Sequence, residues 1–401
     1  MLLSLVKQKL SSPSSFIFTI LRNFFPIITI KNNSFVFRFT DVQRVLLEDD
    51  NFGVPYKERM AKVTDGGNFF LGMDIEDPNY TIDKTNMQLV INRDDIPEII
   101  LPYVRKEAQK IIAASKGEID VVKSLAYQVS ANLMADYLGV SGADSAELID
   151  WSSSLFEYLF FDILDNTTLN DKEFLTKSKL FREYLDNLIK KRKKAKFKSD
   201  FNQNNILDRC LILQKNAVNR MNDIYIRNNM LGIIIGAIPT TARSVALVLE
   251  YLINNPKILK QARQAALDDD LTKLKPYIFE ALRMNPFTPI LLRNCKRDYR
   301  FKGLISSHKI RQGNKVFAVV QSAMFDSRVV TKPKDFRTDR KASDYMIFGA
   351  GFHHCFGRYI NQVQITEIVR PLLQKPNLRF ADNSNKAVYQ NNMPLSLKLK
   401  F

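Results

Sequence analysis

The amino-acid sequence predicts a mainly α-helical protein with a small β-region, and three observations carry this prediction. Apolar residues recur at helical spacing over several long segments, the longest of which spans residues 223–254. Strand-like alternation is concentrated between residues 27 and 39. No internal repeat or long low-complexity linker divides the chain, and 401 residues with 45% hydrophobic content can bury a large core.

The first forty residues form an apolar segment followed by a predicted β-hairpin. Residues 27–30 and 34–39 flank a polar turn, and the second of these segments places phenylalanine at every other position. Thr40 is expected to cap a short helix that ends at Leu47. Residues 52–70 show no such periodicity and are predicted to form a loop.

Helices are predicted along most of the remaining chain. An amphipathic helix opens at Leu271, and another follows Cys355 directly. Aromatic residues crowd the end of the helix at residues 145–161, and such stripes belong to the core more often than to a pocket. The other predicted helices span residues 80–92, 97–115, 121–138 and 223–254.

The chain is strongly basic. It carries 59 lysines and arginines against 42 aspartates and glutamates, a net charge of +17, which favours an acidic partner. No nucleic-acid recognition motif with interleaved aromatic residues is visible, so no nucleic-acid partner is expected. An anionic membrane surface or an acidic electron-transfer protein fits the charge better. The densest basic run, residues 190–198, is predicted to be a solvated helix end and loop.

The apolar segment Phe16–Ile30 is too short to span a membrane. A spanning helix needs roughly 20 apolar residues, whereas this segment is interrupted by Arg22, Asn23 and Pro26. No small-residue cleavage site follows it, so a signal peptide is not predicted. Peripheral contact of this amphipathic segment with an anionic membrane remains open.

Cysteine and histidine are scarce. Cys210, Cys295 and Cys355 show neither a disulfide pairing pattern nor metal-ligand spacing, which favours a reducing, cytoplasmic location. The chain has three histidines in all, so a metal site built from several histidines is not expected.

Cys355 nevertheless lies in a setting suited to metal chemistry. It belongs to a glycine-rich stretch, residues 348–357, and an amphipathic segment begins directly after it. Gly349, Gly351 and Gly357 allow bulged and left-handed backbone and a close approach to a flat ligand. The free N–H groups at the start of the following helix favour a thiolate over a thiol. Such a thiolate is a good axial ligand for haem iron, whereas the alternative is a buried structural cysteine in a turn.

This stretch resembles the haem-thiolate loop of the cytochrome P450 family. The family pattern places a phenylalanine, a glycine, a basic residue and a second glycine around the cysteine. Phe348, Gly351, His353 and Gly357 match that pattern around Cys355.

The resemblance implies one large P450 fold over residues 1–401, although length alone would suggest two or three domains. Within it, residues 1–40 form the apolar segment and hairpin, residues 223–254 the central helix, and residues 345–375 the haem loop and following helix. Haem b is the implied cofactor, with Cys355 as the ligand of its iron. The implied activity is insertion of an oxygen atom into a hydrophobic small molecule.

The centre of the longest predicted helix resembles the family's helix across the haem face. Gly236 and Ala237 are small and would leave room for the cofactor. Thr240 stands where monooxygenases carry the threonine that hydrogen-bonds dioxygen, and Thr241 follows it. Pro239 replaces the acidic residue usual for proton delivery; it lacks an N–H and is expected to kink the helix.

Two kinds of oxidant are compatible with this pattern. A monooxygenase would receive electrons from an acidic ferredoxin or flavodoxin docked on the basic surface. Pro239, however, cannot carry a proton, which favours a peroxide-dependent oxygenase or a fatty-acid hydroperoxide isomerase that needs no reductase. A fatty acyl substrate would suit the second interpretation. A non-catalytic haem-binding protein is a third interpretation, which the two threonines disfavour.

Glu280 and Arg283 stand three residues apart on a predicted helix and can pair on one face. The pair alone is a common pattern. Its interval to Cys355, and residues 336–340 between them, resemble the family's arrangement, in which an arginine of the second segment joins the pair. The resemblance therefore implies a structural triad of Glu280, Arg283 and Arg340, which would be costly to break.

Two residues match haem propionate contacts of the family, and a third position departs from the family pattern. Arg293 follows a proline-rich turn, and a guanidinium suits a carboxylate bidentately. His353 matches a second contact. Many bacterial members carry His and Arg four residues apart on the helix at residues 80–92, whereas this chain has Tyr80 and Lys84 there. Lys84 can still pair with a carboxylate as a point charge.

Overall fold

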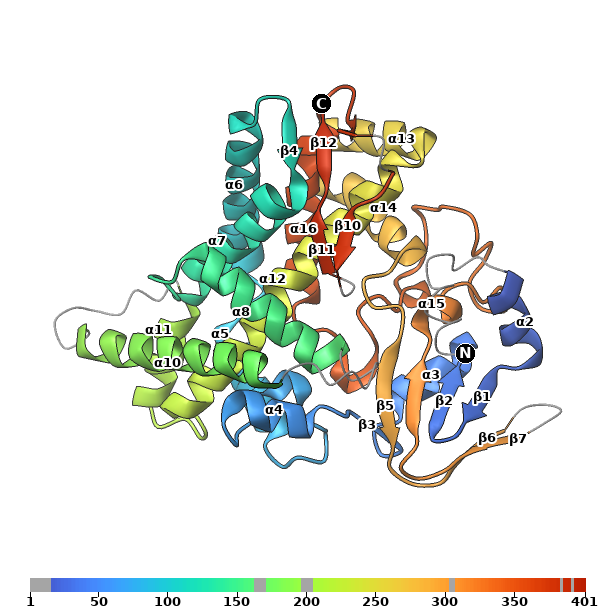
Figure 1. Ribbon diagram of the computed structural model, residues 1–401, viewed down its shortest axis with the longest axis horizontal. Helices are drawn as coiled ribbons and strands as arrows, with labels where there is room; N and C mark the ends of the chain where they lie inside the picture. Colours follow the sequence, from blue (N-terminus) through green and yellow to red (C-terminus); the bar gives the residue numbers. More distant parts are fainter. Residues whose placement is uncertain (1–15, 162–170, 196–204, 303–306, 383–384, 391–392) are drawn as a thin grey trace. The chain divides into compact units, whose positions relative to one another are not determined.

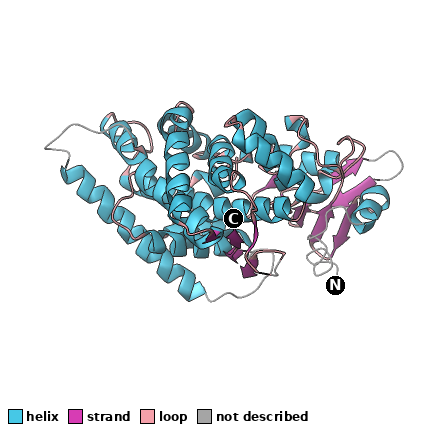
Figure 2. Cartoon of the chain, turned by 90° about the horizontal axis from the view of Figure 1, so that it is seen from above, coloured by secondary structure: helices cyan, strands magenta, loops and turns pink. Residues whose placement is uncertain are grey.

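A computed structural model of the chain shows two compact units, dominated by helices, with strands gathered in a few small sheets (Figure 1, Figure 2). The first unit takes its described residues from 1–55 and 247–358, and the second from 56–246 and 359–401. The predicted mainly α fold with a small β-region is confirmed. The structure describes residues 16–161, 171–195, 205–302, 307–382, 385–390 and 393–401.

A five-stranded sheet in the order β1-β2-β8-β5-β3 organises the first unit. The predicted hairpin forms as β1 and β2, which pair antiparallel. Strand β8 runs parallel to β2 and antiparallel to β5, and β5 pairs antiparallel with β3. The strands of this unit are β1 (Ile27–Ile30), β2 (Asn33–Val36), β3 (Phe52–Gly53), β5 (Leu291–Cys295), β6 (Tyr299–Lys302), β7 (Ser307–Ile310) and β8 (Lys315–Ala318), of which β6 and β7 form a separate hairpin.

Short helices flank this sheet. Helix α14 begins after Asp270 because that carboxylate accepts a hydrogen bond from the Thr272 N–H at 2.8 Å, a side-chain N-cap. The helices of the first unit are α2 (Phe16–Phe24), α3 (Phe39–Leu47), α13 (Pro256–Leu267), α14 (Leu271–Met284) and α15 (Val320–Ala323), with 3-10 turns at Ala342–Asp344 and Gly351–His353.

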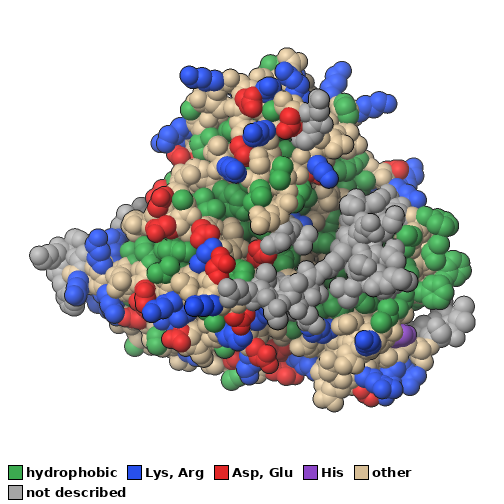
Figure 3. Space-filling view, in the orientation of Figure 1, with side chains coloured by type: hydrophobic (Ala, Val, Ile, Leu, Met, Phe, Trp, Pro, Cys, Tyr) green, Lys and Arg blue, Asp and Glu red, His purple; other side chains and the backbone are tan. Residues whose placement is uncertain are grey.

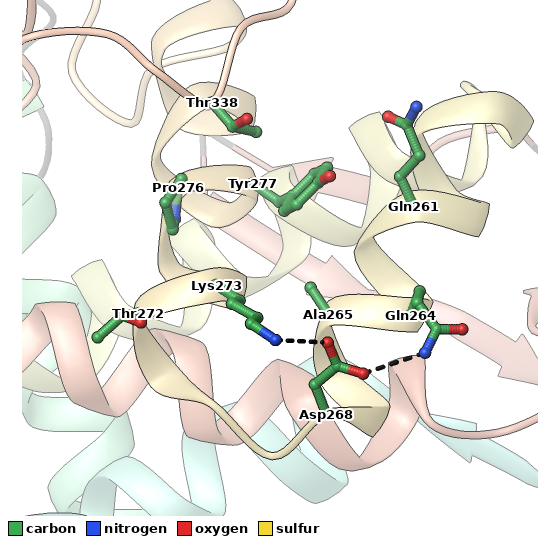
Figure 4. A pocket seen from close by; sticks show the side chains of 9 residues that line it. All are labelled: Gln261, Gln264, Ala265, Asp268, Thr272, Lys273, Pro276, Tyr277 and Thr338. Atoms are coloured by element: carbon green, nitrogen blue, oxygen red, sulfur yellow. Dashed lines mark hydrogen bonds and ion pairs between the residues drawn. The ribbon is translucent and has the colours of Figure 1, made fainter.

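A surface depression of about 460 Å³ lies on the first unit between α13 and α14 (Figure 4). Among the lining residues, Lys273 and Gln264 donate hydrogen bonds to the Asp268 carboxylate at 3.0 and 3.1 Å. None of the residues predicted to bind haem lines this depression.

The second unit is built around the long helix α12 (Asp223–Ile253), which contributes most of its length to it. Among the described residues, α12 alone has the length and hydropathy of a membrane span, and 78% of its most apolar window is buried inside the protein. Packing within the fold therefore accounts for its apolar character.

Helix α8 begins at Ser145, the residue at which the sequence predicts it to begin. Asp144 and Glu147 form a capping box. The Asp144 side chain accepts a hydrogen bond from a backbone N–H of the first turn, and the Glu147 side chain accepts one from the Asp144 N–H. The helices of the second unit are α4 (Lys57–Thr64), α5 (Tyr80–Val90), α6 (Leu101–Ala114), α7 (Tyr127–Leu138), α8 (Ser145–Phe156), α10 (Asp171–Ala195), α11 (Ile206–Lys215), α12 and α16 (Arg358–Leu373), with a 3-10 turn at Phe70–Gly72 and π-helical turns at Ile96–Ile100, Val121–Ala126 and Glu157–Phe161.

Two small sheets complete the second unit. Strand β12 pairs antiparallel with both β4 and β9, and β10 pairs antiparallel with β11. The strands are β4 (Glu118–Asp120), β9 (Arg379–Phe380), β10 (Val388–Gln390), β11 (Met393–Ser396) and β12 (Lys398–Lys400).

Three local predictions are wrong. The second hairpin strand ends at Val36, and Arg38 rather than Thr40 is the N-cap of α3. The N–H of Phe39, in the first turn of α3, donates to the Asp326 carboxylate at 3.1 Å, so its partner lies 287 residues away and leaves no local signal. The predicted loop at residues 52–70 contains the eight-residue helix α4, which is too short to establish a helical period.

Candidate functional site

The cysteine loop folds back on itself, because the Cys355 N–H donates to the Phe348 carbonyl at 2.9 Å. Gly349 and Gly351 both adopt a φ of 72°, in the left-handed region. A Cβ at Gly351 would lie 2.6 Å from the Leu46 carbonyl oxygen on α3. Gly351 therefore has no room for a Cβ, and the left-handed φ of Gly349 favours glycine, as the sequence predicts. Gly357, the third glycine of the pattern, does not have a positive φ.

The Cys355 thiol is partly buried at the end of this loop. Burial raises its pKa to about 11, although the Gly357 N–H and the charge of Arg358 both lower it. The N–H at the start of the following helix lowers the pKa of this thiol, in the predicted direction, but desolvation raises it by more. A coordinating metal ion deprotonates a thiol outright, so ionisation of this sulfur is a property of the metal complex.

A buried ionic network centred on Glu280 links separate parts of the first unit. Arg283 donates from Nε and Nη2 to the two Glu280 carboxylate oxygens at 2.9 and 2.8 Å. Arg340 Nε donates to Glu280 Oε1 at 2.8 Å. The side chains of Glu280 and Arg283 are fully buried. The three residues of the predicted triad thus lie together.

Two further groups join this network that sequence reasoning missed. The Tyr345 hydroxyl donates to Glu280 Oε2 at 3.2 Å, and the Arg337 backbone N–H donates to Glu280 Oε1 at 3.1 Å. Burial raises the pKa of Tyr345, and the nearby charge of Glu280 raises it further. Tyr345 stands three residues before Phe348, so the network reaches the segment that leads into the cysteine loop. No local pattern marks a tyrosine 65 residues away as a partner of Glu280.

Arg293 is buried on β5, the strand that packs against the cysteine loop. A Cβ at Gly349 would lie 3.6 Å from Leu291 Cδ1, so Leu291 points at the loop. Arg293 lies two residues further along the strand and therefore on the same face as Leu291. Its Nη1 donates to the Leu292 carbonyl at 3.0 Å. The structure thus places a buried arginine on the face of β5 that meets the loop through Leu291.

His353 and Phe348 hold the loop from inside the first unit. His353 Nε2 lies 3.6 Å from the Asp49 carboxylate, and both side chains are almost fully buried. The predicted propionate-binding histidine therefore already has a carboxylate neighbour within the chain. The ring of Phe348 packs near Phe279 and His354, with centroid distances of 5.8 and 6.4 Å.

In the second unit, one face of α12 is more open than the rest of that helix. Ile233, Gly236, Ala237 and Thr240 are partly exposed, whereas the positions between them are buried. The spacing i, i+3, i+4, i+7 places these four residues on one helix face. A Cβ at Gly236 would meet its nearest neighbour, Leu71, only at 3.8 Å. Small side chains therefore leave space along this face.

Helix α12 continues without interruption through Pro239. Because proline has no N–H, the Ile235 carbonyl loses its usual donor four residues ahead. Thr240 Oγ1 donates back to the Gly236 carbonyl at 2.6 Å. Thr241 is buried instead, with its Oγ1 3.2 Å from Asn361 Oδ1 on α16. The two adjacent threonines thus have different surroundings, one on the open face and one inside the scaffold.

Lys84 keeps the predicted spacing from Tyr80 on α5. Its Nζ donates to the Tyr80 hydroxyl at 3.1 Å and lies 5.2 Å from the centre of the Tyr80 ring. Tyr80 itself is buried. The lysine is partly buried, and an ammonium group at this position can pair with a carboxylate.

These residues fit haem in three respects, each observed within one unit. A thiol, the soft donor that suits haem iron, ends a glycine loop that closes too tightly against α3 for any Cβ at Gly351. Arg293 supplies a buried cation beside that loop for an acidic cofactor group. Gly236 and Ala237 give α12 a low, partly exposed face suited to a flat ring.

Comparison with known proteins shows the family of the chain. The cytochrome P450 family model matches residues 107–400. A steroid C26-monooxygenase of Mycolicibacterium smegmatis is 24% identical over 315 residues, covering 78% of this chain and 74% of that protein. The biotin biosynthesis cytochrome P450 of Bacillus subtilis is 22% identical over 288 residues, covering 70% and 67%.

Solved structures show the same fold. The crystal structure of CalO2 superposes with a TM-score of 0.81 at 21% identity, covering 98% of this chain and 97% of that one. P450BioI in complex with hexadec-9Z-enoic acid ligated acyl carrier protein gives a TM-score of 0.81 at 20% identity, covering 98% and 99%.

Proposed function

Because the chain belongs to the cytochrome P450 family, we propose that it is a haem-thiolate oxidoreductase that inserts an oxygen atom into a hydrophobic small molecule, with Cys355 as the axial ligand. The observation that carries the proposal is the cysteine loop, which left-handed glycines shape and the Glu280 network supports. Haem b, bound there, would supply iron for oxygen activation. A thiolate ligand donates electron density to that iron.

The chain's own residues have separable roles in this proposal. Arg293 and Lys84 provide positive charge for the haem propionates. Gly236 and Ala237 leave space over the ring. The Thr240 hydroxyl, whose proton is directed at the Gly236 carbonyl, presents its lone pairs to the open face of α12 and so accepts a hydrogen bond from a water or substrate group there.

Pro239 distinguishes two oxidants. With dioxygen, an acidic ferredoxin or flavodoxin must deliver electrons, and protons must arrive by a route that avoids position 239. A peroxide already holds the two electrons that dioxygen would have to receive and brings its own proton, so neither a reductase nor a proton relay through position 239 is needed. The replacement of an acid by proline favours the peroxide as a second candidate, either in a peroxide-dependent oxygenase or in a fatty-acid hydroperoxide isomerase.

A fatty acyl chain is the substrate class we propose. The relatives differ in this respect: one curated relative is a steroid C26-monooxygenase, whereas one solved neighbour carries hexadecenoic acid on acyl carrier protein. The absorption spectrum of the haem-loaded protein, titrated with palmitic acid and in parallel with a steroid, tests the choice. A spectral change with the steroid and none with the fatty acid would contradict it.

The axial ligand is tested by Cys355→Ser, with Cys210→Ala as the matched control. Cys210 is fully buried in α11 and carries no predicted role. The haem spectrum of the reduced protein under carbon monoxide should change for Cys355→Ser and stay as in the wild type for Cys210→Ala. An unchanged spectrum in Cys355→Ser would overturn the assignment.

The oxidant is tested by mixing the purified ferric protein with a fatty-acid hydroperoxide without reductant. Rapid loss of the peroxide that disappears in Cys355→Ala supports the peroxide route. Turnover only after addition of a ferredoxin system supports the monooxygenase. Pro239→Asp sharpens the result, because restoring an acid should raise the reductase-driven activity and leave the peroxide activity unchanged.

A further inference from the structure

Helix α2 is inverted relative to an ordinary surface helix. Its buried residues are Phe18 and Arg22, which share the inner face. The opposite face presents Phe16 and Phe24, whose exposed fractions are 76% and 72%, and Phe25 follows at 57%. A surface helix normally buries its apolar face and exposes its charges. Here an arginine is inside and phenylalanines are outside.

The fold holds α2 firmly in this orientation. Arg22 Nη1 donates to both the carbonyl and the hydroxyl of Ser322 on α15, each at 3.2 Å. The ring of Phe18 packs against Phe37, with a centroid distance of 6.2 Å. The outward position of the phenylalanines is therefore fixed by buried contacts of the inner face.

The C-terminal end of α2 is closed by two arginines. Arg38 donates to the carbonyls of Arg22 and Asn23 at 2.8 and 2.9 Å, and Arg328 donates to the Arg22 carbonyl at 3.2 Å. Cations that bind the last carbonyls stabilise a helix end. Contacts at its inner face and at its C-terminus therefore fix α2 on the surface of the first unit.

Basic residues lie near this apolar face in the sequence and in the first unit. Lys31 is exposed after β1, and the first acidic residue of the chain is Asp41. The hairpin of β6 and β7 adjoins β1, because Thr29 Oγ1 and His308 Nε2 lie 3.0 Å apart. Figure 3 shows hydrophobic side chains gathered where α2 lies and basic side chains gathered around the β6–β7 hairpin.

An exposed apolar residue and an exposed lysine lie in the chain between α2 and the β6–β7 hairpin. Ile30 ends β1 with 43% of its surface exposed, and Lys31 follows in the hairpin turn at a φ of 54°. Exposed apolar residues of α2 and Ile30 and basic residues of the β1–β2 turn and the β6–β7 hairpin thus all belong to the first unit.

We propose that α2 and the β1–β2 turn dock the protein on a membrane rich in anionic phospholipid. Exposed phenylalanines favour the boundary between headgroups and acyl chains, and neighbouring lysines and arginines are attracted to anionic headgroups. Nine helical residues extend about 13 Å, less than half of a bilayer core, so the helix lies in the interface and does not cross it. This surface goes beyond the proposed reaction and does not depend on it.

Vesicle co-sedimentation of the full-length protein tests the proposal. The probes are vesicles of phosphatidylcholine alone and of phosphatidylcholine with phosphatidylglycerol. We expect binding to the anionic vesicles, weak binding to the neutral ones, and release as salt is raised. The variant Phe16→Ser/Phe24→Ser/Phe25→Ser should lower the partition coefficient on the order of tenfold or more.

The matched control is Leu89→Ser/Leu180→Ser, which removes exposed apolar side chains from α5 and α10. It should bind anionic vesicles like the wild type. Equal loss in the control, or no vesicle binding by the wild type at low salt, overturns the proposal. A concentration-dependent mass in sedimentation velocity that the phenylalanine variant abolishes, without vesicle binding, would also overturn it, since a second copy would then cover the face.

A second variant keeps the test valid if the triple substitution unfolds the protein. Phe24→Trp places a fluorescent tryptophan on the exposed face of α2, whereas the native Trp151 is buried. Addition of anionic vesicles should shift the Phe24→Trp emission to shorter wavelength and leave the wild-type emission unchanged. An unchanged Phe24→Trp spectrum would contradict insertion of α2 into the interface.

Discussion

The described residues contain two buried glutamate–arginine–arginine clusters, one in each compact unit, and in both an arginine follows the glutamate by three residues. The first is the Glu280 network. In the second, Glu367 accepts hydrogen bonds from Arg370 Nε at 3.0 Å and from Arg105 Nε at 2.8 Å. Both glutamates are fully buried, and both pair with an arginine three residues later on the same helix.

The clusters differ in what else they hold. Glu280 also accepts from the Tyr345 hydroxyl, and its partner Arg283 donates to the carbonyls of Met324 and Pro333 at 3.1 and 2.9 Å. The first cluster thus fixes irregular segments on the way to the cysteine loop. The second joins two regular helices, α6 and α16, which their own backbone hydrogen bonds already define. Both Glu-x-x-Arg pairs are buried ion pairs, and they differ in the third segment that each one binds.

The largest expected effect is that of Glu280→Gln. The substitution keeps the size of the side chain but leaves Arg283 and Arg340 without their carboxylate, which should lower the free energy of unfolding by about 3–5 kcal/mol. Because Tyr345 loses its charged acceptor as well, the cysteine loop should lose its support and haem content should fall. Urea unfolding and the haem absorbance of the purified protein measure both effects. Wild-type haem content in this variant would show that the loop does not need the network.

The matched substitution Glu367→Gln should cost less stability. Arg105 is partly exposed, so water compensates part of its charge, and we expect a loss of about 3 kcal/mol, at the lower end of the range for a broken buried pair. Haem content should remain at the wild-type level, since α6 and α16 keep their helical structure. Loss of haem equal to that of Glu280→Gln would remove the distinction between the two clusters.

The adjacent threonines of α12 repeat the contrast on a smaller scale. Thr241→Val leaves Asn361 without its hydroxyl partner inside the scaffold and should cost about 1–3 kcal/mol. Thr240→Val removes a hydrogen bond on the open face and should lower the free energy of unfolding by about 1 kcal/mol. It should also change the turnover of substrate or hydroperoxide. Unfolding curves and turnover of both variants, measured together, separate the two roles. A larger change of turnover in Thr241→Val would reverse the assignment.

Much of the fold and of the cysteine site follows from local sequence. The long apolar period of α12, the alternating phenylalanines of the hairpin and the glycines at 349 and 351 specify their structures within a few residues. The triad can be predicted from the sequence because Glu280, Arg283 and Arg340 match a family pattern. Glu367 and Arg370 have the same spacing without that pattern, and nothing in the sequence distinguishes their burial from a solvated helix pair.

The remaining features depend on contacts between distant segments. The N-terminus of α3 is set by Asp326, and the Glu280 network is completed by Tyr345, neither of which leaves a local signal. The ionisation of Cys355 is another case. The sequence shows the helix start that lowers the pKa of the thiol, but burial, which raises it more, is a property of the folded surroundings.

The smallest expected effect concerns the tyrosine that distinguishes the first cluster. Burial and the charge of Glu280 raise the pKa of Tyr345 above its ordinary value of 10. Above pH 10 the unfolded chain therefore releases this proton before the folded protein does, and the free energy of unfolding falls as pH rises, by up to about 1.4 kcal/mol per pH unit. Tyr345→Phe should cost about 1 kcal/mol at neutral pH and show a shallower decline between pH 10 and 12. Parallel curves for the two proteins would mean that Tyr345 does not share the buried charge of Glu280.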